Sequence, residues 1–150
     1  MQPSRILPDL QCSLICEQVR REANGNFFLI GVLDGLVLPQ FPMVLPALCA
    51  FNRWTSGVGQ FTSAFRLVAP DQVTVIQKGE VKFQMKDPKR NATTVLILQQ
   101  LRFPDPGVYY VEIMVDDVMK VRYPLPVLAI PHPTPAPPQA QSPETSTGAE

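Results

Sequence analysis

The sequence predicts an all-β protein, an antiparallel two-sheet sandwich, with a closed β-barrel as the alternative. Three observations predict this class. Short segments alternate apolar and polar residues with a period of two. Turn-forming Gly, Pro, Asn and Asp residues interrupt these segments roughly every dozen residues. No apolar pattern with a helical period extends over a useful length.

The first strand is expected to run from Leu10 towards Glu22. Its predicted inward face carries Leu10, Cys12, Leu14 and Cys16. Asn24-Gly25 then gives the strongest hairpin-turn signal in the chain. The segment 27–33 is apolar on both faces, which predicts a central strand covered on both sides. Three prolines predict an irregular connection after it: Pro39, Pro42 and Pro46.

The second half contains the better-marked strands. They are expected at residues 47–55, 59–68, 73–77, 80–86, 93–103, 107–116 and 118–127. Two inward faces follow from the alternation, one with Phe61, Ser63, Phe65 and Leu67, the other with Val95, Ile97 and Leu101. Asp116-Asp117 is expected to form the turn between the last two strands.

The 150 residues divide into three predicted parts: an N-terminal lead (1–9), the sandwich domain (10–130) and a tail (131–150). The tail contains six prolines and no Leu, Ile, Val or aromatic residue. Such a segment cannot bury enough apolar surface to offset its ordering, so we expect disorder. A docking peptide for proline-reading domains is the alternative.

The charge balance limits the partners. Thirteen basic residues face thirteen acidic ones, which is not typical of a nucleic-acid-binding protein. No apolar run is long enough to predict a membrane span, and residues 1–10 do not resemble a signal peptide. We therefore expect a cytoplasmic protein that contacts neither nucleic acid nor membrane.

Cysteine and histidine usage predicts a non-enzyme. The chain has three cysteines, Cys12, Cys16 and Cys49. This odd number favours reduced, buried thiols over disulfides, with a metal or redox site as the alternative. His132 is the sole histidine and falls in the tail, so the domain has no imidazole for a catalytic triad or a histidine-bearing zinc site. We expect no catalytic residue, cofactor or metal. The remaining enzymatic alternative uses carboxylates alone, such as Asp34 with Glu17.

The segment Leu101–Tyr109 contains the pattern D-x-G-x-Y, formed by Asp105, Gly107 and Tyr109. It resembles the corner before the penultimate strand of immunoglobulin-like domains. The resemblance implies an immunoglobulin-like sandwich in which the Tyr109 hydroxyl ties the turn to upstream backbone. The sequence departs from that family because no cysteine follows Tyr109 to form a disulfide beside a core tryptophan.

The first half carries a second resemblance. The segments 16–25, 29–34, 39–42 and 53–55 are similar to a family of short bacterial proteins of unknown function, over most of residues 10–128. This resemblance implies a bacterial origin and a small sandwich, and it brings no activity, cofactor or substrate.

Two groups of residues are candidates for an interaction surface, and a third group is basic. Arg20, Arg21 and Glu22 approach the predicted hairpin tip, where they form either a recognition site or an ordinary solvated end beside the structural turn of Asn24 and Gly25. Arg53, Trp54 and Tyr110 form either an aromatic platform or, for Trp54, part of the core. The basic cluster is expected to protect a sheet edge: Lys78, Lys82, Lys86, Lys89 and Arg90.

These observations predict a non-enzymatic binding or scaffold module. Its partner is an unknown protein or a second copy of the chain. A small-ligand or carbohydrate-binding sandwich is the alternative, with Arg53, Trp54 or Tyr110 in a cleft at the sheet edge.

Overall fold

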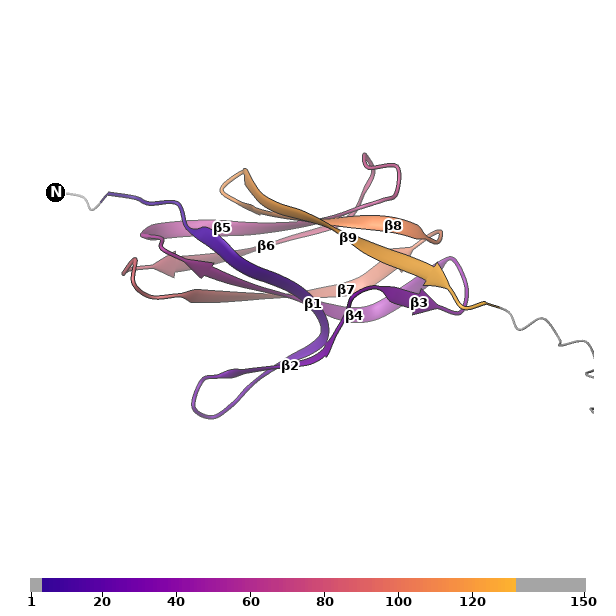
Figure 1. The fold of residues 1–150 in the computed structure, drawn as a ribbon, viewed down its shortest axis with the longest axis horizontal. Helices are drawn as coiled ribbons and strands as arrows, with labels where there is room; N and C mark the ends of the chain where they lie inside the picture. The colour runs from indigo at the N-terminus through magenta and orange to yellow at the C-terminus, as the bar shows by residue number, and fades with distance from the viewer. Residues whose placement is uncertain (1–3, 132–150) are drawn as a thin grey trace, which may run out of the picture.

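The computed structural model describes residues 4–131 and contains nine strands in two packed sheets (Figure 1). The predicted tail lies outside the described residues except for Pro131. The strands are β1 (Asp9–Arg21), β2 (Phe27–Val32), β3 (Leu36–Leu38), β4 (Met43–Thr55), β5 (Gly59–Val68), β6 (Val75–Met85), β7 (Ala92–Phe103), β8 (Gly107–Val115) and β9 (Val118–Ala129).

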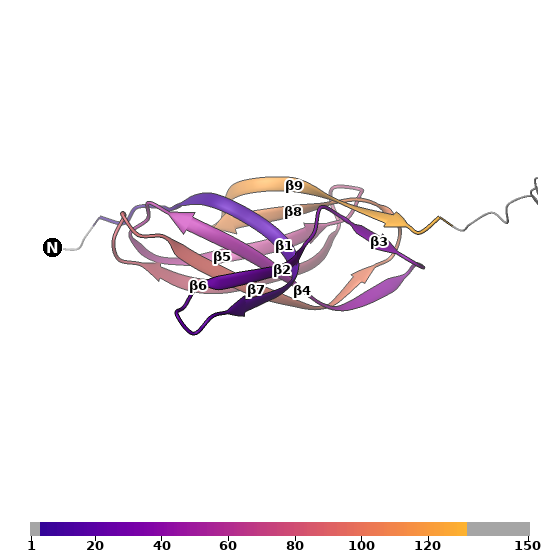
Figure 2. The same ribbon diagram turned by 60° about the horizontal axis from the view of Figure 1, so that its bottom comes forward.

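The two layers have four and five strands, in the orders β2-β1-β4-β7 and β3-β9-β8-β5-β6. In Figure 2, β8 and β9 lie together along the top of the body. The chain is a sandwich and not a closed barrel. One sheet is antiparallel, but the other is mixed, because the chain crosses from β2 to the opposite sheet and β3 then pairs with β9 in parallel. The predicted two-sheet sandwich is confirmed, and the parallel pair of β3 with β9 is its one departure from antiparallel order among the described strands.

The core lies between the sheets and has a large aromatic component. Trp54, Phe103 and Tyr109 are fully buried. Trp54 stacks on Phe83 with ring centroids 5.4 Å apart, and its indole N–H donates to the Thr94 hydroxyl at 3.1 Å. The predicted inward face of β5 is confirmed, since its four residues are buried. This alternation packs β5 directly against the four-stranded sheet.

Two expected faces are wrong because single residues interrupt the alternation. β4 continues through Pro46, which lies opposite Gln100 between the pairs Leu45–Leu101 and Ala47–Gln99. Gln100 has a φ of 53°, which interrupts the alternation of β7. Leu98 faces the core before it, and Leu101 faces the core after it. The other two members of that expected face lie outside the core, with Ile97 60% exposed. In β1, a register shift between Leu10 and Cys12 breaks the expected face in the same way.

β6 is one strand where the sequence predicts two. The expected break at Lys78-Gly79 is absent because Gly79 leaves room for the neighbouring sheet. A Cβ atom at Gly79 would lie 2.7 Å from the Leu96 side chain of β7. The Gln77 amide also donates to the Gln99 carbonyl at 3.3 Å. β6 and β7 therefore bring the two sheets together along one side.

The N-terminal lead joins the sandwich within its described part. Ile6 and Val58 exchange two backbone hydrogen bonds. Arg5 donates to the Asp116 carboxylate and, at 3.0 Å, to the Gln60 carbonyl. These contacts hold the lead against the end of the five-stranded sheet.

The expected corner at Tyr109 has the predicted geometry. The Tyr109 hydroxyl donates to the Asp105 carbonyl at 2.6 Å. Gly107 has a φ of 151°, and a Cβ atom there would lie 2.7 Å from Pro70. Burial raises the pKa of Tyr109, so the hydroxyl keeps its proton and remains a donor. These contacts hold the corner together.

Candidate interaction surface

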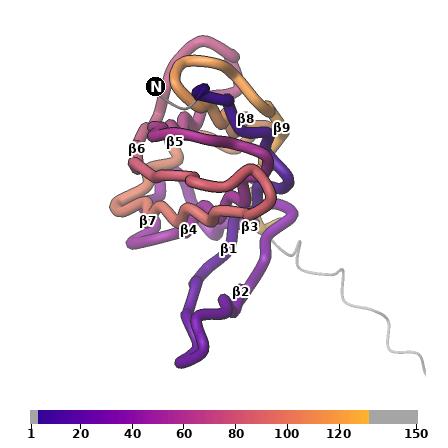
Figure 3. The backbone as a smooth tube through the Cα atoms, turned by 90° about the vertical axis from the view of Figure 1, so that its left-hand side faces the viewer, coloured from indigo at the N-terminus to yellow at the C-terminus, as the bar shows by residue number. Residues whose placement is uncertain are grey.

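The β1–β2 hairpin is the part of the molecule that projects from the sandwich body (Figure 3). Its loop is closed by Glu22 N–H donating to the Asn26 carbonyl at 2.7 Å. The Asn24 side chain accepts from Asn26 N–H at 2.9 Å, and Gly25 supplies the positive φ of 93°. The predicted Asn24-Gly25 turn is confirmed, and it fixes the register that places β2 beside β1.

β2 is an edge strand, which corrects the prediction that residues 27–33 form a central, doubly covered strand. Its only neighbour in the four-stranded sheet is β1. Phe28 is 52% exposed, Ile30 41% and Val32 48%. Because strand residues alternate between faces, one face of β2 is solvated although it is apolar. A run that is apolar on both faces cannot distinguish a central strand from an uncovered edge.

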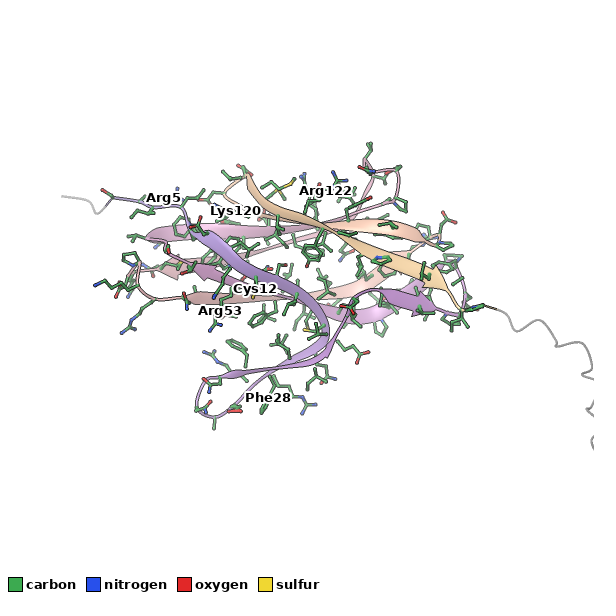
Figure 4. All side chains as sticks on the ribbon, viewed as in Figure 1. Arg5, Cys12, Phe28, Arg53, Lys120 and Arg122 are labelled. Carbon is green, nitrogen blue, oxygen red and sulfur yellow. The ribbon has the colours of Figure 1, made fainter. Side chains whose placement is uncertain are left out.

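The opposite face of the hairpin packs on the sandwich. Phe27 meets Phe51 of β4 edge to face, with centroids 5.8 Å apart. The Arg21 guanidinium lies 5.0 Å from the centre of the Phe27 ring. The Glu17 side chain lies against Gly31, which has a φ of 68°, and a Cβ atom there would lie 2.5 Å from the Glu17 carboxylate. These contacts hold β2 in place and leave Ile30 and Phe28 exposed. Figure 4 shows Phe28 pointing away from the sandwich body.

The charged residues at the hairpin tip are exposed but locally bonded. Arg20 donates to the Gln18 side chain at 3.2 Å, and Arg21 to the Gly25 carbonyl at 3.3 Å. Glu22, half-buried, closes the loop through its backbone. The structure therefore brings Arg20, Arg21 and Glu22 together beside the β2 edge, at one end of its exposed apolar row.

The structure does not bring Arg53, Trp54 and Tyr110 into one cleft. Trp54 has no exposed surface, so it cannot contact a ligand. Arg53 is exposed on β4 of the four-stranded sheet. Tyr110 belongs to β8 of the other sheet, where the Arg122 guanidinium lies 4.4 Å from its ring centre. Arg53 and Arg122 accordingly lie far apart on the body in Figure 4.

Two of the cysteines pair across strands without a disulfide. Cys16 and Cys49 are opposite each other in the β1–β4 ladder, and both are buried. Burial, and then the neighbouring Cys49 thiol, raises the pKa of Cys16. Protonated thiols are poor nucleophiles and poor metal ligands. Within residues 4–131, no three Cys, His, Asp or Glu side chains gather closely enough to hold a metal ion.

The outer face of the five-stranded sheet carries an ion-pair network. Glu112 is buried and accepts from Arg66 at 2.8 Å, with the Arg122 Nε 3.8 Å away on its other side. An open groove of about 540 Å³ lies nearby over β5, with Thr62, Lys82 and Arg5 among its lining residues. Arg5 already binds Asp116 there, so the groove offers polar contacts and the charge of Lys82.

The basic cluster lies on and just beyond an edge strand, as expected. β6 ends the five-stranded sheet, and its Lys78 and Lys82 side chains are exposed. Lysines on a sheet edge prevent pairing with other chains because a new strand would have to desolvate them. The sequence therefore located a protected edge correctly and missed the unprotected one.

Comparison with known proteins adds a family and no activity. Residues 4–131 contain no helix long and apolar enough to span a membrane. A comparison with curated proteins returns no match. The sequence model of a family of unknown function, DUF6941, matches residues 11–128, which cover nearly all of the sandwich and the projecting hairpin. The chain therefore belongs to the DUF6941 family.

Proposed function

We propose that this chain is a non-enzymatic protein-binding module whose contact surface is the β2 edge of the projecting hairpin. One observation carries the proposal: β2 is an edge strand with a row of exposed large apolar side chains and no charged residue or proline. Native proteins usually block such edges, because unpaired N–H and C=O groups bind any extended segment that fits. The edge is suited to accept a strand from a protein partner.

The rest of the proposal extends the sequence-based expectations. We propose a bacterial, cytoplasmic protein that contacts neither nucleic acid nor membrane. The balanced charges support this view, as do the buried Cys16 and Cys49 thiols, which form no disulfide. The Tyr109 corner supports an immunoglobulin-like relationship for the C-terminal half. The alternative of a small-ligand or carbohydrate-binding module is less well supported, because Trp54 is fully buried and Arg53 and Tyr110 lie on different sheets.

The experiment places a photo-crosslinking phenylalanine analogue at Phe28 and compares three backgrounds. These are the otherwise natural chain, Ile30→Lys on the β2 edge, and Ile97→Lys on β7. Ile97 is the matched control, since it is an exposed isoleucine of the same sheet.

We expect crosslinks from the natural background and from Ile97→Lys, and their loss in Ile30→Lys. Mass spectrometry of the crosslinked peptides should locate the contact in an extended segment of the partner. Equal crosslinking in all three backgrounds would contradict the proposal.

A further inference from the structure

The edge strands of the described part of the molecule differ in how they are protected. β3 has three residues and is followed directly by Pro39. β6 presents Lys78 and Lys82, and β7 lies against β6. β2 alone combines six residues with no charge, no proline and an exposed apolar row. The sandwich thus has one edge on which a further strand can pair.

We infer that the strand that pairs with β2 is the β2 of a second copy, in antiparallel order, joining two four-stranded sheets into one of eight strands. The inference rests on the proposed function and names its partner. The β2 edge is complementary to a second copy of itself. A two-fold axis near Leu29 places Phe28 of each copy opposite Ile30 of the other. Aromatic and β-branched residues form favourable cross-strand pairs.

The charges at the two ends of β2 favour this antiparallel arrangement. The tip end carries exposed Arg20 and Arg21, whose combined charge exceeds that of the single acid Glu22. The other end carries exposed Glu17, against Gly31, and exposed Asp34 just beyond the strand. An antiparallel partner brings each basic end beside an acidic end, whereas a parallel partner would bring like charges together.

The geometry also closes the assembly. A two-fold pair uses the same edge on both copies, so neither copy retains a free β2. The remaining edges are short, carry lysines or lie against one another, which stops the sheet from growing into a fibre. The left-handed Gly31 limits the regular part of the edge to residues 27–30, which favours a reversible dimer.

The test is sedimentation velocity of the full chain at micromolar concentrations, with Ile30→Lys and Ile97→Lys as the matched pair. We expect a concentration-dependent dimer that Ile30→Lys weakens by at least about tenfold, because each lysine would replace the isoleucine that packs on Phe28 of the other copy and would have to be desolvated beside it. Ile97→Lys should leave the dimer unchanged. A natural chain that stays monomeric, or an Ile30→Lys dimer of equal strength, would overturn the inference.

Charge reversal tests the antiparallel order separately. Arg20→Glu with Arg21→Glu should weaken the dimer, and Glu17→Lys with Asp34→Lys should weaken it too, each more strongly at low salt. Combining all four changes in one chain should restore association, because the ends are again opposite in charge. Failure to restore it would exclude this arrangement.

The outcomes separate the two proposals. If the natural chain is monomeric but the Phe28 crosslinker captures an extended segment of another protein, the β2 edge is a binding surface and the second-copy inference fails. If no crosslink and no dimer depends on Ile30, both proposals fail.

Discussion

The hairpins β1–β2 and β8–β9 are built alike and used differently. Each joins two antiparallel strands through a tight turn of residues with positive φ, Gly25 in one and Asp116-Asp117 in the other. β8 and β9 lie inside their sheet and bury Val111, Ile113 and Leu125, whereas β2 ends its sheet. Apolar content alone therefore does not decide whether a hairpin stabilises the fold or remains open to a partner.

The sharpest test of this contrast removes the same side chain from each hairpin. Ile113→Ala should lower the free energy of unfolding by about 2 to 5 kcal/mol, because the side chain is fully buried. Ile30→Ala should change it by about 1 kcal/mol or less in dilute monomer, because that residue is 41% exposed and lies outside the core. Urea unfolding measures both. A large loss from Ile30→Ala would show that β2 contributes to the fold in its own right.

The hydroxyl groups of two adjacent tyrosines in β8 give the next largest difference. Tyr109→Phe leaves the Asp105 carbonyl without its donor and should cost about 1 to 3 kcal/mol. Tyr110→Phe, on the outer face, should cost about 0.5 kcal/mol or less. Thermal unfolding of the two variants compares them directly. Equal effects would mean that the corner hydrogen bond contributes little.

Stability should also fall in alkaline solution because of buried tyrosines in β8 and β9. Burial raises the pKa of Tyr109 and of Tyr123, whose hydroxyl meets the Ser13 hydroxyl at 3.0 Å. Above the ordinary pKa of about 10, the unfolded chain releases protons that the native state retains, so the free energy of unfolding decreases as pH rises. Urea midpoints measured across this range should decline less steeply for Tyr109→Phe and Tyr123→Phe. Unchanged slopes would contradict the assignment.

The smallest expected effects distinguish the two turns. Gly25→Ala should destabilise the protein by about 1 kcal/mol, because alanine is strained at a φ of 93°. Asp117→Gly should stabilise it by about 0.5 kcal/mol, because Asp-Gly suits this turn better than Asp-Asp. Asp116 is kept, since its carboxylate accepts from Thr62 N–H at 2.9 Å. Differential scanning calorimetry resolves the two signs, and a stabilising Gly25→Ala would show that the loop relaxes.

Sequence patterns predicted the elements that depend on neighbours along the chain. The turns at Asn24-Gly25 and Asp116-Asp117 and the Tyr109 corner depend on local chemistry, and they appear where expected. The patterns failed where a distant strand decides the outcome. Gly79 lies within a continuous strand because the Leu96 side chain of β7 occupies the space of a Cβ atom there. At Gln100, opposite Pro46, the inward-facing residues of β7 change from one side of the strand to the other.

The candidate site was only partly predictable for the same reason. The charged tip at Arg20 and Arg21 could be found from its position beside the turn. The exposure of Phe28 and Ile30 could not, since it depends on the absence of a neighbour for β2 among the described strands. The sequence favoured a core position for Trp54 over a surface platform, and its neighbours Phe83 and Thr94 place it in the core.

The close approach of Gly79 to Leu96 has a consequence for how the sandwich loosens. The two sheets are joined most closely on the β6–β7 side, where the Gln77 amide bridges them. Breathing motions should then begin at the opposite margin, where β2 has a single neighbour. Among the strands, amide hydrogen exchange would be fastest in β2 and slowest in β5 and β8. A bulkier residue at position 79 would separate β6 from β7 and speed amide hydrogen exchange throughout the sandwich.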